Sequence, residues 1–248
     1  MTKTYRLKIE RDEDPRDPRE DDNMCAMWLW HKRARLGEEK PEGLLDRYQA
    51  MCHLLAEQDR EFVDELAQYS SSHTPKECSE LIEKEFGRHY IWSLVYAYEH
   101  SGITISLKPF SFRFDSGVLG IIFVERQDAI TQLMYEPSLH EGLGAYVERV
   151  TREEMAIEVQ QYDDYLQGNV YGFVLESHVW PFEIPGHGVD ISDNTLDWDD
   201  EESAWGFYGD NPTVNGISEH LEQRFPGAVK LAYDNLGKWV HVTPKETT

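Results

Sequence analysis

Three apolar runs in the middle of the chain limit its possible folds more than any other feature. Residues 90–98, 103–107 and 118–124 are rich in β-branched and aromatic residues, and Gly and Pro lie between the runs. Such side chains pack well on a pleated surface, whereas Gly and Pro are typical of the turns that join strands. The pattern therefore predicts neighbouring antiparallel strands that form a sheet near the centre of the chain.

Helices are predicted before and after these strands in the sequence. Apolar residues recur every three or four positions over residues 44–69, which is the stripe of an amphipathic helix. Residues 74–87 begin with a Thr cap, a Pro at the first helical position and a Glu three residues after the cap, and they end at a Gly. The same capping pattern at Thr151 predicts a helix that stops at Gly168.

Short strands and long loops complete the expected order. The remaining strands are predicted at residues 4–10, 24–31, 170–175, 204–208 and 229–233, with a last helix over 211–226. Residues 11–23 and 180–202 are predicted as long loops because they are rich in Pro, Gly or charged residues. Helices among mostly antiparallel strands indicate an α+β fold, with one central sheet, several flanking helices and a single domain over residues 1–248.

The negative charge of the chain is concentrated in its second half. Residues 153–223 contain 17 Asp and Glu and no Lys or Arg, so this window carries −17 of the net charge of −23. A field of one sign repels nucleic acid and anionic membranes, and it attracts basic surfaces. We therefore expect a protein partner with a basic surface, and no direct binding to nucleic acid or membrane. The sequence leaves the oligomeric state open.

The candidate partner-binding surface is the predicted loop at 180–202, which contains both acidic and aromatic residues. Aromatic side chains are enriched in the centres of interfaces, and carboxylates beside them would meet Arg and Lys in place of phosphate. The candidate residues are Trp180, Phe182, Glu183, Asp190, Asp193, Asp197, Trp198, Asp199, Asp200, Glu201 and Glu202. Trp205 and Phe207, in the following strand, are expected in the core. The alternative is a solvated acidic loop that binds nothing.

No catalytic residue, metal site or cofactor is predicted. His100, Ser101 and Asp115 are the residue types of nucleophilic catalysis, which keeps a small hydrolase or transferase as an alternative. However, their segments have the composition of turns between strands. The acidic loop lacks the spacing of a calcium-binding EF-hand, and the three widely spaced cysteines fit neither a disulfide framework nor a zinc site.

The expected location is the cytoplasm, because no apolar run is long enough to span a membrane and the first 14 residues lack the apolar core of a signal peptide. A salt-rich host offers a further alternative, since such organisms coat their proteins with carboxylates. In that case the chain would be an accessory globular protein whose acidity has no specific partner.

Three segments carry a distinctive pattern. They are YEHSGITISLKPFSFRFDSGVLGIIFV at residues 98–124, YDDYLQGNVYGFVLE at 162–176 and WGFYG at 205–209, which together make up about a fifth of the chain. They resemble a family of small proteins carried by phages and conjugative plasmids, whose members share the HSGITIS segment, the DSG turn and the Tyr-Gly-Phe-Val strand. Phe112, Arg113 and Phe114 stand where the family pattern has Cys, Pro and Trp.

The resemblance implies a genetic setting and no catalytic residues. Acidic accessory proteins of mobile elements are often inhibitors of host defence, including anti-restriction and anti-CRISPR proteins. Together with the charge, this leads us to expect a non-enzymatic inhibitor that binds a basic, nucleic-acid-binding surface of a host defence complex. A type I CRISPR surveillance complex is the first choice, and inhibition would block nucleic-acid binding or displace subunits.

Overall fold

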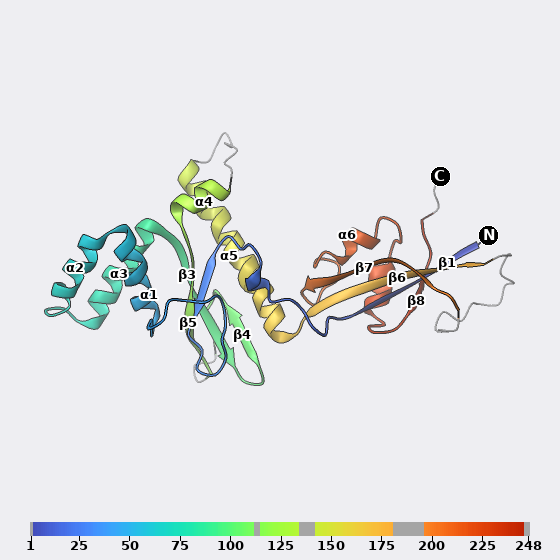
Figure 1. Cartoon of the computed structure of the whole chain (residues 1–248), viewed down its shortest axis with the longest axis horizontal. Helices are drawn as coiled ribbons and strands as arrows, with labels where there is room; N and C mark the ends of the chain where they lie inside the picture. The colour runs from blue at the N-terminus through green and yellow to red at the C-terminus, as the bar shows by residue number, and fades with distance from the viewer. Residues whose placement is uncertain (1, 112–114, 134–141, 181–195, 246–248) are drawn as a thin grey trace. The chain divides into compact units, whose positions relative to one another are not determined.

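The computed structural model describes residues 2–111, 115–133, 142–180 and 196–245 (Figure 1). Contacts between Cα atoms divide the chain into two compact units. Unit 1 consists of Met1–Asp17 and Asp164–Thr248, and unit 2 consists of Pro18–Asp163. Each unit holds one four-stranded antiparallel sheet, so the strands form two sheets where the sequence predicted one.

The sheet of unit 2 has the strand order β2-β5-β3-β4. Its strands are β2 (Ala26–Leu29), β3 (Tyr90–Glu99), β4 (Ile103–Ser106) and β5 (Ser116–Glu125). This confirms the three central strands and the short strand before them. Gly120 allows β2 and β5 to pair closely, because a Cβ at this position would lie 2.1 Å from the carbonyl oxygen of Trp28.

Three helices share one apolar cluster with this sheet: α1 (Arg47–Gln58), α2 (Arg60–Tyr69) and α3 (Pro75–His89). Met51 of α1 and Phe86 of α3 are fully buried and join Phe123 of β5 in one apolar cluster. Phe86 stacks on Tyr90 at the start of β3, with ring centroids 4.4 Å apart. The apolar stripes of these helices are therefore buried as the sequence predicted.

The ends of these helices differ in part from the prediction. The single helix expected over 44–69 is wrong, because the chain breaks at Asp59, whose φ of −146° and ψ of 82° are not helical. Its carboxylate accepts the N–H of Phe62 at 3.0 Å and so caps α2. The capping box of Thr74 and Glu77 at the start of α3 is confirmed.

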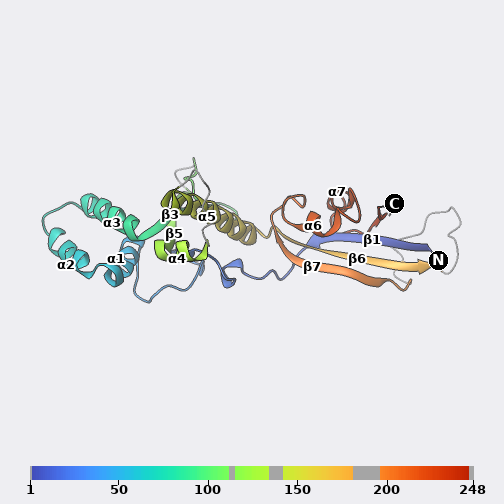
Figure 2. The same ribbon diagram turned by 90° about the horizontal axis from the view of Figure 1, so that it is seen from above.

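Helix α5 (Leu143–Gln167) is longer than predicted, and the short α4 (Arg126–Gln132) precedes it in the chain. Its unit 2 part lies along the sheet (Figure 2), where Asp163 Oδ1 accepts the N–H of Ile105 at 2.7 Å. The predicted start at Thr151 is wrong, because α5 begins at Leu143 and Thr151 lies in its interior. Gly168 ends the helix as expected, with a φ of +70°.

The sheet of unit 1 has the order β7-β6-β1-β8. Its strands are β1 (Thr2–Arg11), β6 (Val170–Trp180), β7 (Asp199–Tyr208) and β8 (Val240–Val242). One face packs on α6 (Ile217–Leu221) and α7 (Ala228–Tyr233), with Leu7, Phe173 and Leu175 fully buried in that core. The other face carries Arg6 and several tryptophans.

Three predictions in unit 1 need correction. The last helix expected over 211–226 is reduced to the five residues of α6, and the strand expected at 229–233 is the helix α7. The long loop expected at 180–202 is shorter, because Trp180 still belongs to β6 and 199–202 already belong to β7. In the other loop, at 11–23, Pro18–Glu20 form a single 3-10 turn.

The α+β class with antiparallel sheets is confirmed. The two sheets arise because β1 pairs with β6 and β8, near the other end of the chain, instead of with the central strands. An alternating pattern identifies a strand but contains little information about its partner. The single domain over residues 1–248 stays a prediction.

Candidate functional site

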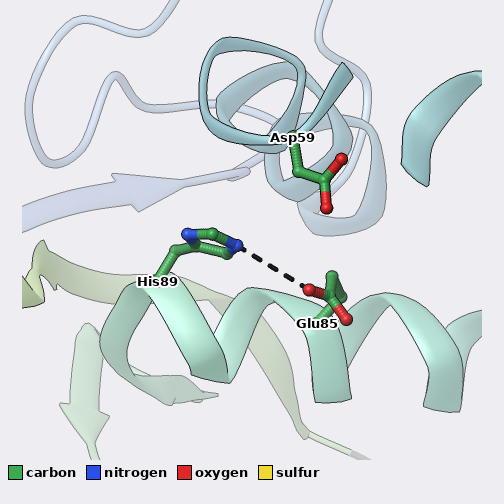
Figure 3. A group of neighbouring side chains, drawn as sticks. All are labelled: Asp59, Glu85 and His89. Atoms are coloured by element: carbon green, nitrogen blue, oxygen red, sulfur yellow. Dashed lines mark ion pairs between the residues drawn. The ribbon is translucent and has the colours of Figure 1, made fainter. Parts of the chain in front are cut away.

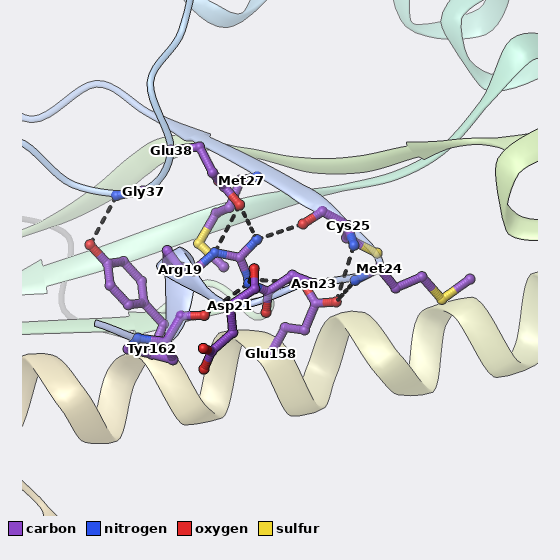
Figure 4. Close-up of polar contacts among 11 residues, drawn as sticks. Arg19, Asp21, Asn23, Met24, Cys25, Met27, Gly37, Glu38, Glu158 and Tyr162 are labelled. Atoms are coloured by element: carbon purple, nitrogen blue, oxygen red, sulfur yellow. Dashed lines mark hydrogen bonds and ion pairs between the residues drawn. The ribbon is translucent and has the colours of Figure 1, made fainter. Parts of the chain in front are cut away.

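Glu158, in the acidic window, belongs to a buried polar network in unit 2 (Figure 4). The Arg19 side chain is only 2% exposed; its Nη1 donates to Glu158 Oε2 at 2.9 Å, and its Nε donates to Glu38 Oε1 at 3.0 Å. Glu158 Oε1 accepts the N–H groups of Met24 and Cys25 at 2.9 and 3.1 Å. Burial raises the pKa of Glu158, and these donors oppose that rise. This carboxylate therefore holds the fold together and is not offered to a partner.

Glu201 is the centre of a second network, in unit 1. Its Oε1 accepts from Lys3 Nζ at 2.5 Å and from Ser177 Oγ at 2.7 Å, and its Oε2 lies 3.3 Å from Arg224 Nη2. The hydrogen bond from Lys3, followed by that from Ser177, lowers the pKa of Glu201 from 4.5 to about 2. Glu202, next in the chain, lies 3.0 Å from His220 Nδ1. Both carboxylates thus have partners inside unit 1.

The open face of the unit 1 sheet carries a third pair. Glu176 Oε2 lies 2.6 Å from both Nε and Nη2 of Arg6, whose side chain is 5% exposed. The guanidinium also stacks on Trp198 and Trp239, with its Cζ 4.2 and 4.1 Å from the two ring centroids. Charge and cation–π attraction therefore fix Trp198 on the sheet.

These networks reduce the negative charge that residues 153–223 can offer to a partner. The cations that it lacks come from outside it: Lys3, Arg6, Arg19 and Arg224 all lie before residue 153 or after residue 223. The folded chain therefore neutralises part of the window, and fewer carboxylates are available to a partner than the sequence suggests.

The carboxylates of the acidic window that stay exposed include those at the start of β7. Asp197, Asp199 and Asp200 are exposed, and within the described residues their side chains make no ion pair. β7 is an edge strand of the sheet, and Trp198 lies between these carboxylates in sequence. We call Asp197, Trp198, Asp199 and Asp200 the β7 acidic patch.

The remaining candidate residues are placed as follows. Trp180 ends β6, and its Nε1 donates to Thr4 Oγ1 at 3.1 Å. Phe182, Glu183, Asp190 and Asp193 lie outside the described residues. Of the two aromatic residues expected in the core, Phe207 does pack against it. Trp205 does not, because it lies over Gly172 on the open face and is 46% exposed.

The residues of the enzymatic alternative lie in segments that flank strands of unit 2. His100 and Ser101 lie in the exposed turn between β3 and β4, where the N–H of His100 donates to the Gly102 carbonyl at 3.3 Å. Asp115 directly precedes β5 and lines a pocket of about 530 Å³, whose lining includes neither His100 nor Ser101. In the part of the chain that the structure describes, no hydrogen bond joins the three side chains. The enzymatic alternative stays a prediction.

A different group of side chains has the composition of a metal site, which the sequence did not predict. Asp59, Glu85 and His89 place their ligand atoms within 4.8 Å of one another in unit 2 (Figure 3). Glu85 and His89 are four residues apart on α3, so they share one face of the helix. That spacing was visible in the sequence, but the approach of Asp59 was not.

Comparisons with protein-family models, with curated proteins and with solved structures find no match. Among the described residues, no helix combines the length and apolar character needed to cross a membrane. Function is therefore inferred from the geometry of the sites themselves.

Proposed function

We propose that this protein is a cytoplasmic, non-enzymatic inhibitor from a mobile genetic element, which binds a basic, nucleic-acid-binding surface of a host defence complex. A type I CRISPR surveillance complex is the first choice of target. The observation that carries the proposal is the β7 acidic patch, in which exposed carboxylates without an ion pair among the described residues flank a tryptophan at the start of an edge strand. The resemblance of residues 98–124 and 162–176 to proteins of phages and conjugative plasmids supports the genetic setting.

The patch has features that suit the binding of Arg and Lys side chains. Trp198 is already fixed by Arg6, so little side-chain entropy would be lost when a partner packs against it. The flanking carboxylates would form charge-assisted hydrogen bonds with guanidinium groups that otherwise hold phosphate. Two register shifts interrupt the pairing of β6 with β7, a feature that discourages the addition of another strand. We therefore expect the partner to meet side chains of the patch and not to extend the sheet.

A capture experiment tests the proposal. The full chain, attached to a resin, should recover a nucleic-acid-binding complex from a defence-proficient host at moderate salt. A triple variant, Asp197→Lys, Asp199→Lys and Asp200→Lys, should not. Glu201 and Glu202 are left unchanged in this variant because they stabilise unit 1.

The matched control changes three exposed acids of α2 by the same charge: Glu61→Lys, Asp64→Lys and Glu65→Lys. It should capture the complex as the wild type does. Recovery of no nucleic-acid-binding protein by the wild type would reject the proposed class of partner. Equal loss of capture in both triple variants would reject the β7 acidic patch as the site.

A further inference from the structure

The cluster of Asp59, Glu85 and His89 lies where two helices end. α1 ends at Gln58 and α3 ends at His89, but Asp59 also caps the start of α2, so the helix dipoles at this place partly oppose one another. The attraction for a cation therefore comes from the two carboxylates, Asp59 and Glu85.

The side chains already leave coordinating atoms available. Glu85 is 8% exposed, and its Oε2 accepts from Arg88 Nη1 at 2.7 Å. Its other oxygen, Oε1, faces His89 Nε2 at 3.7 Å (Figure 3). Asp59 uses Oδ1 to cap α2 through Phe62, which leaves Oδ2 free to bind a metal. Each residue can thus offer one atom without giving up the contact that positions it.

We propose that Asp59, Glu85 and His89 bind a divalent transition metal, with zinc as the best fit. Zinc accepts imidazole nitrogen and carboxylate oxygen at about 2.0–2.2 Å, and sites with three protein ligands hold water at the fourth position. The ligand atoms lie within 4.8 Å of one another, so rotations of these side chains could place all three around a single ion at that metal–ligand distance. Magnesium and calcium prefer oxygen ligands alone, so the imidazole argues against them. The bound metal would tie the junction of α1 and α2 to the end of α3.

Calorimetric titration of the metal-free full chain with zinc chloride tests this proposal. The wild type should bind one zinc ion, and His89→Ala should weaken binding by at least about ten-fold. Asp59→Asn should do the same while it preserves the fold, because Asn caps a helix as well as Asp does. His53→Ala removes an exposed histidine of α1 outside the cluster and should leave the affinity unchanged.

Two further measurements separate this site from adventitious binding. Zinc should raise the thermal midpoint of the wild type but not of His89→Ala, because a ligand stabilises only the state that binds it. X-ray absorption should show nitrogen and oxygen ligands, with no sulfur at about 2.3 Å. Absence of saturable binding, sulfur ligation, or equal affinity in the wild type and Asp59→Asn would each overturn the proposal.

Discussion

Glu201 lies beside the β7 acidic patch but is expected to contribute to stability instead of binding. The perturbation that separates these roles is Glu201→Gln, which keeps the shape of the side chain and removes its charge. A fall of the pKa from 4.5 to about 2 corresponds to an upper limit of about 3.4 kcal/mol, at about 1.36 kcal/mol for each pKa unit. Lys3 and Arg224 are 39% and 44% exposed, so solvent screens both partners. We therefore expect a loss of about 1–2 kcal/mol at pH 7.

The sign of the pH dependence follows from the direction of this shift. The folded state lowers the pKa of Glu201, so the carboxylate stabilises the fold above pH 4.5, and this contribution is lost as the pH falls from 4.5 toward 2. The difference in unfolding free energy between wild type and Glu201→Gln should therefore be full at pH 7 and small near pH 2.5.

Urea denaturation at several pH values between 7 and 2.5 measures this difference. Glu219→Gln is the control, because Glu219 is an exposed acid of α6 without an ion pair among the described residues. A difference below about 0.5 kcal/mol at pH 7, or one that does not change with pH, would refute the assignment of Glu201 to the fold.

Three other substitutions test the packing of unit 2, each by urea denaturation. Arg19→Met should cost about 3–5 kcal/mol, because it leaves Glu158 charged and buried without its cation; a cost under 1 kcal/mol would contradict the network. Gly120→Ala should cost about 1–3 kcal/mol or more, since its Cβ would lie 2.1 Å from Trp28 O. A neutral effect would show that β2 does not approach β5 so closely. Thr74→Ala should cost about 1 kcal/mol through the lost cap of α3, and unchanged stability would argue against the capping box.

Local features of the fold could be predicted from the sequence because they depend on neighbouring residues. The capping box at Thr74 and the stop at Gly168 are of this kind, as are the three central strands. The break at Asp59 was missed because the apolar stripe continues across it, and only the cap that its side chain forms reveals it.

The candidate site could be predicted only in part. The sequence shows that residues 197–202 are rich in acids, but it could not show that part of them belongs to a strand or which of them are neutralised. Lys3 reaches Glu201 across 198 positions, and Arg19 reaches Glu158 across 139. Such pairs depend on which strands and helices become neighbours, and the hydrophobic pattern does not specify this. The same limit hid the approach of Asp59 to Glu85 and His89.

The rate at which the protein associates with its target, measured over a range of ionic strength, tests the central proposal most directly. With a purified type I surveillance complex as the probe, carboxylates of the β7 acidic patch should steer the encounter. The wild-type association rate should then fall at least about ten-fold between about 0.05 and 0.5 M salt. The variant with Lys at positions 197, 199 and 200 should be slow throughout, and the α2 control should follow the wild type. Equal salt dependence in all three proteins would contradict the account.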